Sequence, residues 1–119
     1  MATTINTTDE TAITTYYRNT DIWEAVVGSG FANTNYWISN VELNTWENPC
    51  DITLTHDTKE GGYKKTTLSP SQLYSAFAKL VIEKTTHCSG YAINDLENAD
   101  SCFADLVVQT AIFDEIVFG

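Results

Sequence analysis

Basic residues are scarce in this sequence: six Lys and Arg stand against 16 Asp and Glu in 119 residues, and the formal net charge is −10. Such a chain repels phosphate backbones, which argues against direct binding of nucleic acid. No run of about 18 apolar residues occurs, so no membrane-spanning helix is predicted. Residues 1–15 also lack the basic and apolar regions of a signal peptide, and we therefore expect a cytoplasmic protein.

Sequence motifs that carry out chemistry are missing as well. Gly28-Ser29-Gly30 follows a predicted helix and precedes extended chain, which is the reverse of a dinucleotide-binding turn. His87 and Cys88 are sequence neighbours, so on extended chain their side chains point apart and form no nucleophile–base pair. No phosphate-binding loop is present, and nothing singles out two carboxylates as acid and base. We therefore expect no catalytic activity and no cofactor.

Cysteine is also sparse, with three residues in no spaced framework. An odd number without an export signal predicts free thiols. The three cysteines and two histidines include no C-x-x-C or H-x-x-x-H pair, the spacing that is typical of zinc sites. No metal site is therefore predicted for these five residues, which are Cys50, His56, His87, Cys88 and Cys102.

The composition is that of a folded protein, with 43% hydrophobic and 12% aromatic residues. A chain of this length forms one domain with a core of its own. We expect a flexible, Thr-rich arm over residues 1–19 and a single globular domain over residues 20–119.

The centre of that domain is predicted to be residues 102–113, which are apolar almost all round a helical wheel and therefore typical of a buried helix. Asp105, Gln109 and Thr110 are its polar interruptions. Asp105 and Gln109 are four residues apart on one stripe, where they can bond to each other or anchor a ligand or the arginine of a partner. We expect the helix to end near Phe113, with the last residues running extended.

Three strands are predicted over residues 36–43, 51–56 and 63–68, because apolar and polar residues alternate there. In the first strand Trp37 and Val41 share one face, and Ile38 is the apolar exception on the polar face. Short turn segments join the three strands, which predicts an antiparallel meander.

Two further helices complete the expected fold. One is predicted over residues 21–27, and the other begins at the clearest local signal in the chain. There Ser69, Pro70 and Gln72 form the N-terminal capping box of a helix that runs to about Lys84. The resulting order α-β-β-β-α-α predicts an α+β fold, a three-stranded antiparallel sheet covered by helices with a central buried C-terminal helix.

Charge is unevenly distributed along the chain. Residues 1–58 carry a net −7, residues 59–84 a net +3 and residues 85–119 a net −6. The acidic flanks favour a partner with a basic surface, and they equally serve solubility.

Candidate binding residues are of two kinds. Tyr36 and Trp46 are aromatic residues expected at the surface, where they can stack on a ring or anchor an interface, whereas Trp37 is expected in the core. The polar candidates are the acids of the loop before the last helix and the stripe on that helix: Asp95, Glu97, Asp100, Asp105 and Gln109.

Residues 104–113, ADLVVQTAIF, are followed by EIVFG after one intervening residue. This segment resembles the end of a family of small, mostly uncharacterised tailed-phage proteins, which close on an A-D-x-[IV]-[IV]-Q-x-A-[LI]-F-G-E-[IV]-V-[YF]-G pattern. Asp114 stands where that pattern has Gly, and Asp tolerates the left-handed conformation better than most residues. The resemblance implies a phage gene product made in an infected bacterial cell, and it implies no activity.

Three functions are consistent with these features of the sequence. The first is a non-catalytic phage accessory protein in the host cytoplasm, which binds and modulates a host protein with a basic surface, as an acidic inhibitor of a nucleic-acid-handling defence enzyme would. The first alternative is a protein that sequesters a nucleotide, with Tyr36 or Trp46 stacking on its ring and Arg18, Lys64 or Lys65 meeting its phosphate. The second alternative is a virion or assembly component. A homodimer through the apolar tail is compatible with all three.

Overall fold

The computed structural model describes residues 17–31, 35–88 and 90–118. Within them, α2 (Asn19–Val27) is followed by three strands, β1 (Ile38–Leu43), β2 (Ile52–Asp57) and β3 (Tyr63–Leu68). Then come α3 (Pro70–Ile82), a small hairpin of β4 (Thr86–His87) and β5 (Tyr91–Ala92), the 3-10 helix η2 (Leu96–Asn98) and α4 (Ser101–Phe113). The predicted α+β order is confirmed. The predicted arm lies outside the described residues except for 17–19, and Asn19 already belongs to α2.

The three strands form one antiparallel sheet in the order β1-β2-β3. Its buried face is built on Ile52, Leu54 and His56 of β2, which alternate with half-buried threonines. Opposite Ile52, β3 places Leu68, which is also buried. The other face of the sheet carries mostly exposed polar side chains, as is usual for an antiparallel sheet with one face on the core.

A β-bulge in β1 accounts for the apolar residue that breaks the alternation. On a regular strand Ile38 and Val41 would point to opposite faces. The pairing with β2 shifts by one residue directly after Ile38. Ile38 therefore lies opposite His56 while Val41 lies opposite Leu54, and both residues point to the buried face. The prediction that placed Ile38 on the polar face was wrong, because it assumed an unbroken strand.

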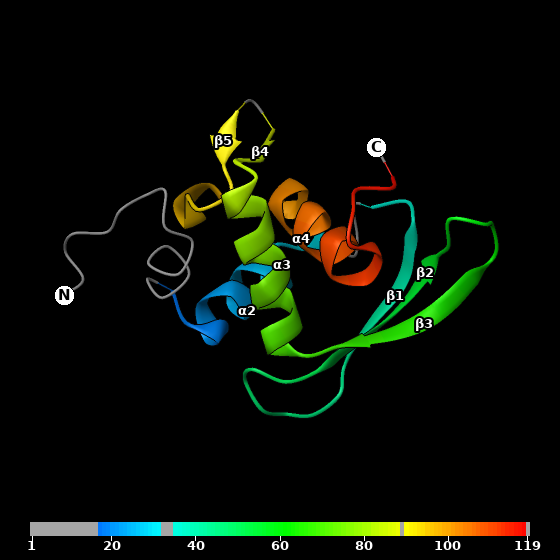
Figure 1. Ribbon diagram of the computed structural model, residues 1–119. Helices are drawn as coiled ribbons and strands as arrows, with labels where there is room; N and C mark the ends of the chain where they lie inside the picture. The colour runs from blue at the N-terminus through cyan, green and yellow to red at the C-terminus, as the bar shows by residue number, and fades with distance from the viewer. Residues whose placement is uncertain (1–16, 32–34, 89, 119) are drawn as a thin grey trace.

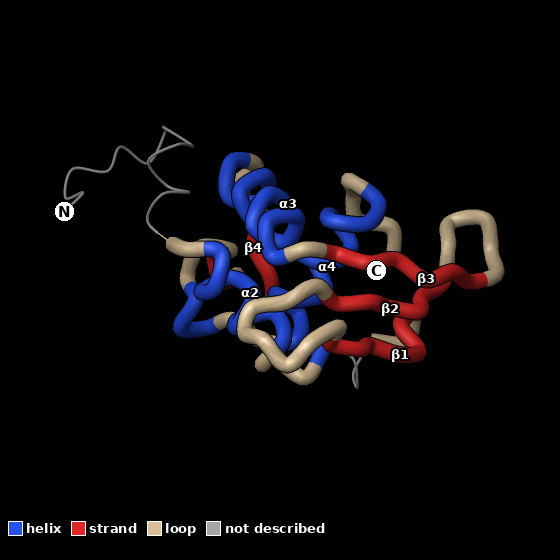
Figure 2. Tube along the Cα trace, turned by 90° about the horizontal axis from the view of Figure 1, so that it is seen from below, coloured by secondary structure: helices blue, strands red, loops and turns tan. Residues whose placement is uncertain are grey.

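Helix α4 lies at the centre of the molecule, between the other two helices and the sheet (Figure 1). Seen from below, the helices gather on one side and the three strands run next to them (Figure 2). Phe103, Ala104, Val107 and Val108 of α4 are fully buried. The predicted central helix is thus confirmed, and its half-buried positions include Ile112. No helix in the described part of the chain is long and apolar enough to cross a membrane.

Helix α3 begins with the capping box that the sequence predicts. Ser69 Oγ accepts from the Gln72 N–H at 3.1 Å, and Gln72 Oε1 accepts from the Ser69 N–H at 2.8 Å. Leu68 and Leu73, on either side of the box, are both buried and form a hydrophobic staple. The helix ends at Ile82, and Lys84 adopts a left-handed conformation with φ of 56°.

The C-terminal segment folds back on α4 after Asp114, which is left-handed with φ of 63°. Asp is one of the few non-glycine residues that enters this region readily, so it can end the helix here. Phe118 then stacks on Trp37, with ring centroids 5.2 Å apart. Residues 116–118 belong to no strand, and this tail covers the core beside α4.

Candidate functional site

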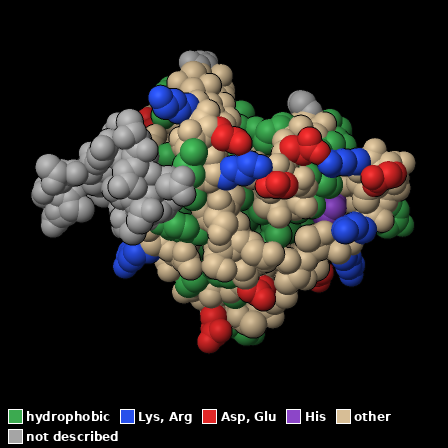
Figure 3. All heavy atoms as spheres, viewed as in Figure 1, with side chains coloured by type: hydrophobic (Ala, Val, Ile, Leu, Met, Phe, Trp, Pro, Cys, Tyr) green, Lys and Arg blue, Asp and Glu red, His purple; other side chains and the backbone are tan. Residues whose placement is uncertain are grey.

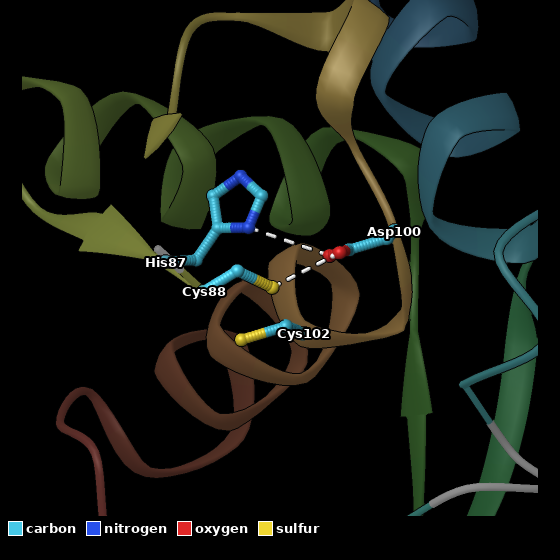
Figure 4. A group of neighbouring side chains, drawn as sticks. All are labelled: His87, Cys88, Asp100 and Cys102. Atoms are coloured by element: carbon cyan, nitrogen blue, oxygen red, sulfur yellow. Dashed lines mark hydrogen bonds and ion pairs between the residues drawn. The ribbon is translucent and has the colours of Figure 1, made fainter. Parts of the chain in front are cut away.

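Four potential metal ligands meet where the β4–β5 hairpin contacts the beginning of α4 (Figure 4). His87 and Cys88 come from the hairpin, Asp100 is the N-cap residue of α4, and Cys102 lies in the first turn of that helix. Each offers one ligand atom, and all four atoms lie within 4.8 Å of one another. Three of the four are among the histidines and cysteines for which the sequence spacing predicts no metal site.

The backbone at Cys88 brings the two neighbouring hairpin side chains together. Cys88 is left-handed with φ of 51°, a conformation that is uncommon for any residue other than Gly, Asn or Asp. On extended chain the side chains of His87 and Cys88 would point apart, and this local turn makes both face Asp100 (Figure 4). The prediction that the two side chains diverge was wrong because it assumed an extended backbone.

His87 is buried without a hydrogen bond. Its exposed fraction is 3%, and neither ring nitrogen has a hydrogen-bond partner. Nδ1 lies 3.3 Å from Asp100 Oδ1 but lacks the geometry of a hydrogen bond. The ring also packs against Phe103, with centroids 5.9 Å apart. A buried polar group without a partner is rare in folded proteins and calls for an explanation.

Asp100 holds the cluster to α4. As the N-cap residue it accepts the Phe103 N–H at Oδ1, at 3.0 Å, and it accepts the Cys88 thiol at Oδ2, also at 3.0 Å. Burial raises the pKa of Asp100, but the hydrogen bonds from Cys88 and Phe103 outweigh it and leave the pKa below its usual value. Bonding to Asp100 and to Cys102 raises the pKa of Cys88 to about 12, since ionising this thiol would add negative charge beside both groups.

The other histidine and cysteine lie elsewhere. His56 is buried in the sheet, and both of its ring nitrogens are bonded, to Asp57 O and to Thr66 Oγ1, each at 2.7 Å. Cys50 is buried below the β1–β2 loop, with its thiol 3.7 Å from Thr45 O. Both residues have the environment of satisfied core side chains rather than of ligands.

The polar residues Asp105 and Gln109 of α4 make hydrogen bonds within the core. The Asp105 carboxylate accepts from Trp37 Nε1 at 2.6 Å and from Gln109 Nε2 at 3.1 Å. Gln109 is fully buried; Nε2 also donates to Phe118 O, and Oε1 accepts the N–H groups of Val117 and Phe118. An amide side chain makes four hydrogen bonds at most, so Gln109 has none left for a partner.

The three acids of the loop before α4, Asp95, Glu97 and Asp100, have different surroundings in the structure. Asp95 accepts from Asn98 Nδ2 at 2.7 Å across η2, and Glu97 is exposed on that turn. Of these candidates, the metal-ligand cluster includes Asp100 alone. No sequence signal could have joined Asp100 to His87, because the two are 13 residues apart and meet through the hairpin.

Tyr36 and Trp46 are exposed, as the sequence predicts. Trp46 lies in the β1–β2 loop with an exposed fraction of 102%, and Tyr36 precedes β1 with 73%. Tyr36 touches Phe118 edge-on at 6.2 Å, whereas the described residues show no ring contact for Trp46. Two hollows in the surface, one between α3 and α4 and one at the β2–β3 turn, are lined by neither aromatic residue. The stacking arrangement of the nucleotide alternative is therefore not assembled at either hollow.

The β1–β2 loop that carries Trp46 is tied down at both ends. The Asn44 N–H donates to Asp51 O at 3.0 Å, which continues the pairing of the two strands. Trp23 Nε1 of α2 donates to Cys50 O at 2.7 Å, which fastens the end of the loop to the helices. A loop held in this way presents Trp46 from a fixed base.

Two acids of the C-terminal flank are paired with lysines of the basic middle segment. Lys79 Nζ of α3 lies 2.8 Å from Asp114 Oδ1, and Lys59 of the β2–β3 turn pairs with Glu115. The face shown in Figure 3 carries Lys or Arg side chains next to acidic ones. These two acids are therefore paired with lysines rather than free to meet a partner.

Comparison of the chain with protein-family models, with curated proteins and with solved structures finds no match.

Proposed function

We propose that this protein is a non-catalytic phage accessory protein that binds a host protein with a basic surface and inhibits it. Trp46 at the β1–β2 loop is the anchor of the interface. The observation that carries the proposal is a fully exposed tryptophan on a loop whose ends are fixed. Exposing a whole indole to water is unfavourable, and in interfaces such residues are enriched among those that contribute most to binding.

The acids beside Trp46 select the chemistry of the partner. Glu42, Glu47 and Asp51 are exposed on the same loop and the adjoining end of β1. In Figure 3 the lower edge of the molecule, where this loop runs in Figure 1, carries acidic side chains. A tryptophan with carboxylates around it suits Arg and Lys, since a guanidinium can stack on the indole while its neighbours pair with the acids.

A basic surface of this kind is one that ordinarily holds nucleic acid. The formal charge of −10 adds long-range attraction to such a partner and repels the nucleic acid itself. The likeness of the C-terminal segment to tailed-phage proteins supports a phage gene product acting in the host cytoplasm. We therefore infer a nucleic-acid-handling defence enzyme as the target.

The test compares the proteins retained from a bacterial lysate by the wild type, by Trp46→Ala and by Tyr63→Ala. Tyr63 is the matched control because it is an aromatic residue on β3 with an exposed fraction of 77%. We expect a basic, nucleic-acid-handling protein to be retained at low ionic strength by the wild type and by Tyr63→Ala, and to be lost from Trp46→Ala. Salt should release it, because charges at the rim of an interface are screened over about 10 Å at 0.1 M.

Charge reversal at the loop adds a second comparison. Glu47→Lys should weaken retention of the same protein, and Glu97→Lys, on η2, should leave it unchanged. If Trp46→Ala retains the same proteins in the same amounts as the wild type, the loop is not the docking site and the proposal fails.

A further inference from the structure

The cluster of His87, Cys88, Asp100 and Cys102 has the spacing of a metal site. Zinc binds sulfur at about 2.3 Å and nitrogen or oxygen at about 2.0–2.2 Å, so the ligand atoms of a tetrahedral site lie roughly 3.3–3.8 Å apart. His87 Nδ1 and Asp100 Oδ1 are 3.3 Å apart, and Cys88 Sγ lies 3.0 Å from Asp100 Oδ2. With all four ligand atoms within 4.8 Å of one another, small side-chain rotations suffice to surround one ion.

His87 supplies an independent reason to expect a ligand. Both ring nitrogens are buried without hydrogen-bond partners, and Nδ1 faces Asp100 and the cluster (Figure 4). Leaving a buried donor or acceptor unpaired costs on the order of 1–3 kcal/mol. A metal ion bound at Nδ1 gives this nitrogen the partner that the described residues do not provide.

The backbone of the hairpin gives a further indication of a ligand. The left-handed backbone at Cys88 points the same way, since an unusual conformation persists where the surroundings enforce it, and such positions gather at ligand sites.

We propose that His87, Cys88, Asp100 and Cys102 bind one Zn²⁺ ion. His87 binds through Nδ1, Asp100 through one carboxylate oxygen, and the two cysteines as thiolates whose protons pass to the solvent. Two thiolates, an imidazole and a carboxylate are the donor set that zinc takes in proteins, whereas Mg²⁺ and Ca²⁺ prefer oxygen alone. Four protein ligands leave no open position, so the site is structural rather than catalytic.

The ion would fasten a part of the chain that has little regular structure. The hairpin strands have two residues each, and η2 has three. The metal joins this hairpin to the first turn of α4, the central helix. Because its ligands come together only in the folded chain, zinc binding adds directly to the stability of the fold.

The first experiment measures metal in the reduced wild-type protein. We expect one zinc per chain by elemental analysis after equilibration with zinc and removal of the excess, and an upward shift of the thermal midpoint that a chelator reverses. Cobalt in place of zinc should give the thiolate-to-metal charge-transfer band and the intense visible bands of a tetrahedral site. Reduced wild-type protein that takes up neither metal would overturn the proposal.

Variants then identify the ligands. Cys88→Ser and Cys102→Ser should each lose zinc, or bind cobalt with a weaker charge-transfer band because one thiolate is missing. Cys50→Ala is the matched control, because Cys50 is free and buried away from the cluster, and it should keep the full metal content and the full spectrum. If Cys88→Ser and Cys102→Ser bind metal as the control does, the ion lies elsewhere and the assignment fails.

The competing explanation is a disulfide between Cys88 and Cys102. It predicts a protein that gains no stability from zinc when reduced, and whose mass falls by two hydrogens on mild oxidation with no metal to lose. That combination would also overturn the proposal. A metal site predicts the opposite order, in which bound zinc protects both thiols from oxidation and chelation exposes them.

Discussion

At the scale of single residues, Gln109 shows how a polar side chain can organise an apolar helix. It is the polar residue that lies deepest in α4, and its amide makes hydrogen bonds to Asp105, Val117 and Phe118. Those bonds hold the tail so that Phe118 stacks on Trp37. Gln109, a polar interruption in the sequence of an apolar helix, thus acts as a clamp: it fastens the C-terminal segment over the core.

Replacing this clamp should destabilise the protein strongly. Gln109→Leu keeps the volume but leaves the two tail N–H groups without their acceptor, and we expect a loss of about 3 kcal/mol in the free energy of unfolding, measured by urea titration. The emission of Trp37 should also change as Phe118 leaves it. Asn40→Ala, at an exposed position of β1, is the control and should change stability by less than about 0.5 kcal/mol. An equal effect of the two changes would contradict the clamp.

Trp37 and Trp46 illustrate what a sequence pattern can and cannot distinguish. Trp37 stands in an alternating segment and Trp46 in a run of turn-forming residues, so their opposite exposures follow from local sequence. The cluster around His87 had no such signal. It depends on one left-handed residue, Cys88, and on a hairpin that brings it to α4. Local pattern rules assume regular backbone and therefore miss a site that an irregular residue creates.

At the scale of elements, the start of α3 was the most predictable feature, because a capping box satisfies backbone N–H groups through side chains only three residues away. Helix α2 begins at Asn19, two residues before its predicted start. The bounds of β3 were predicted for the same reason, since alternation and turns are local. The bulge in β1 was not, because it is set by the neighbouring strand β2. The two-residue strands β4 and β5 are too short to give a pattern of their own.

The cap of α3 offers a test at this scale. Ser69→Ala removes the acceptor for the Gln72 N–H, and we expect the free energy of unfolding to fall by about 1 kcal/mol. Ser75→Ala changes the same residue type at an exposed position inside the helix, where Ala is the better helix former, and it should be neutral or slightly stabilising. Chemical denaturation of both variants decides the matter, and a loss of similar size in Ser75→Ala would show that the cap is not responsible.

At the scale of the whole molecule, charge links parts of the chain that the sequence keeps apart. Lys79 on α3 bonds both the carboxylate and the carbonyl of Asp114, which ties the end of the central helix to its neighbour. The hydrogen bond to Lys79 and the charge of the ammonium group lower the pKa of Asp114. The hydrogen bond to Asp114 in turn raises the pKa of Lys79.

These shifts predict the response of stability to acid. Because the pKa of Asp114 is lower in the folded protein than in the unfolded chain, its contribution is present above about pH 4 and is lost as the pH falls further. Asp114→Asn should therefore lose less stability than the wild type between neutral pH and pH values below 4, as measured by thermal midpoints. Glu97→Gln removes an exposed acid from η2 and controls for net charge. If both variants reduce the loss of stability at low pH by the same amount, the ion pair of Lys79 and Asp114 is not the cause of that loss.

The bulge in β1 has a further consequence for how this chain tolerates changes of length. Ile38 and the residue two positions later lie opposite neighbouring residues of β2, so Ser39 is the surplus member of the ladder. A chain lacking Ser39 would form a continuous ladder with Ile38 and Val41 still on the buried face. One residue added between Val41 and Leu43 would move the side chains at one end of the strand to the opposite face of the sheet. Deletion is therefore mild at the bulge, whereas insertion further along the same strand is severe.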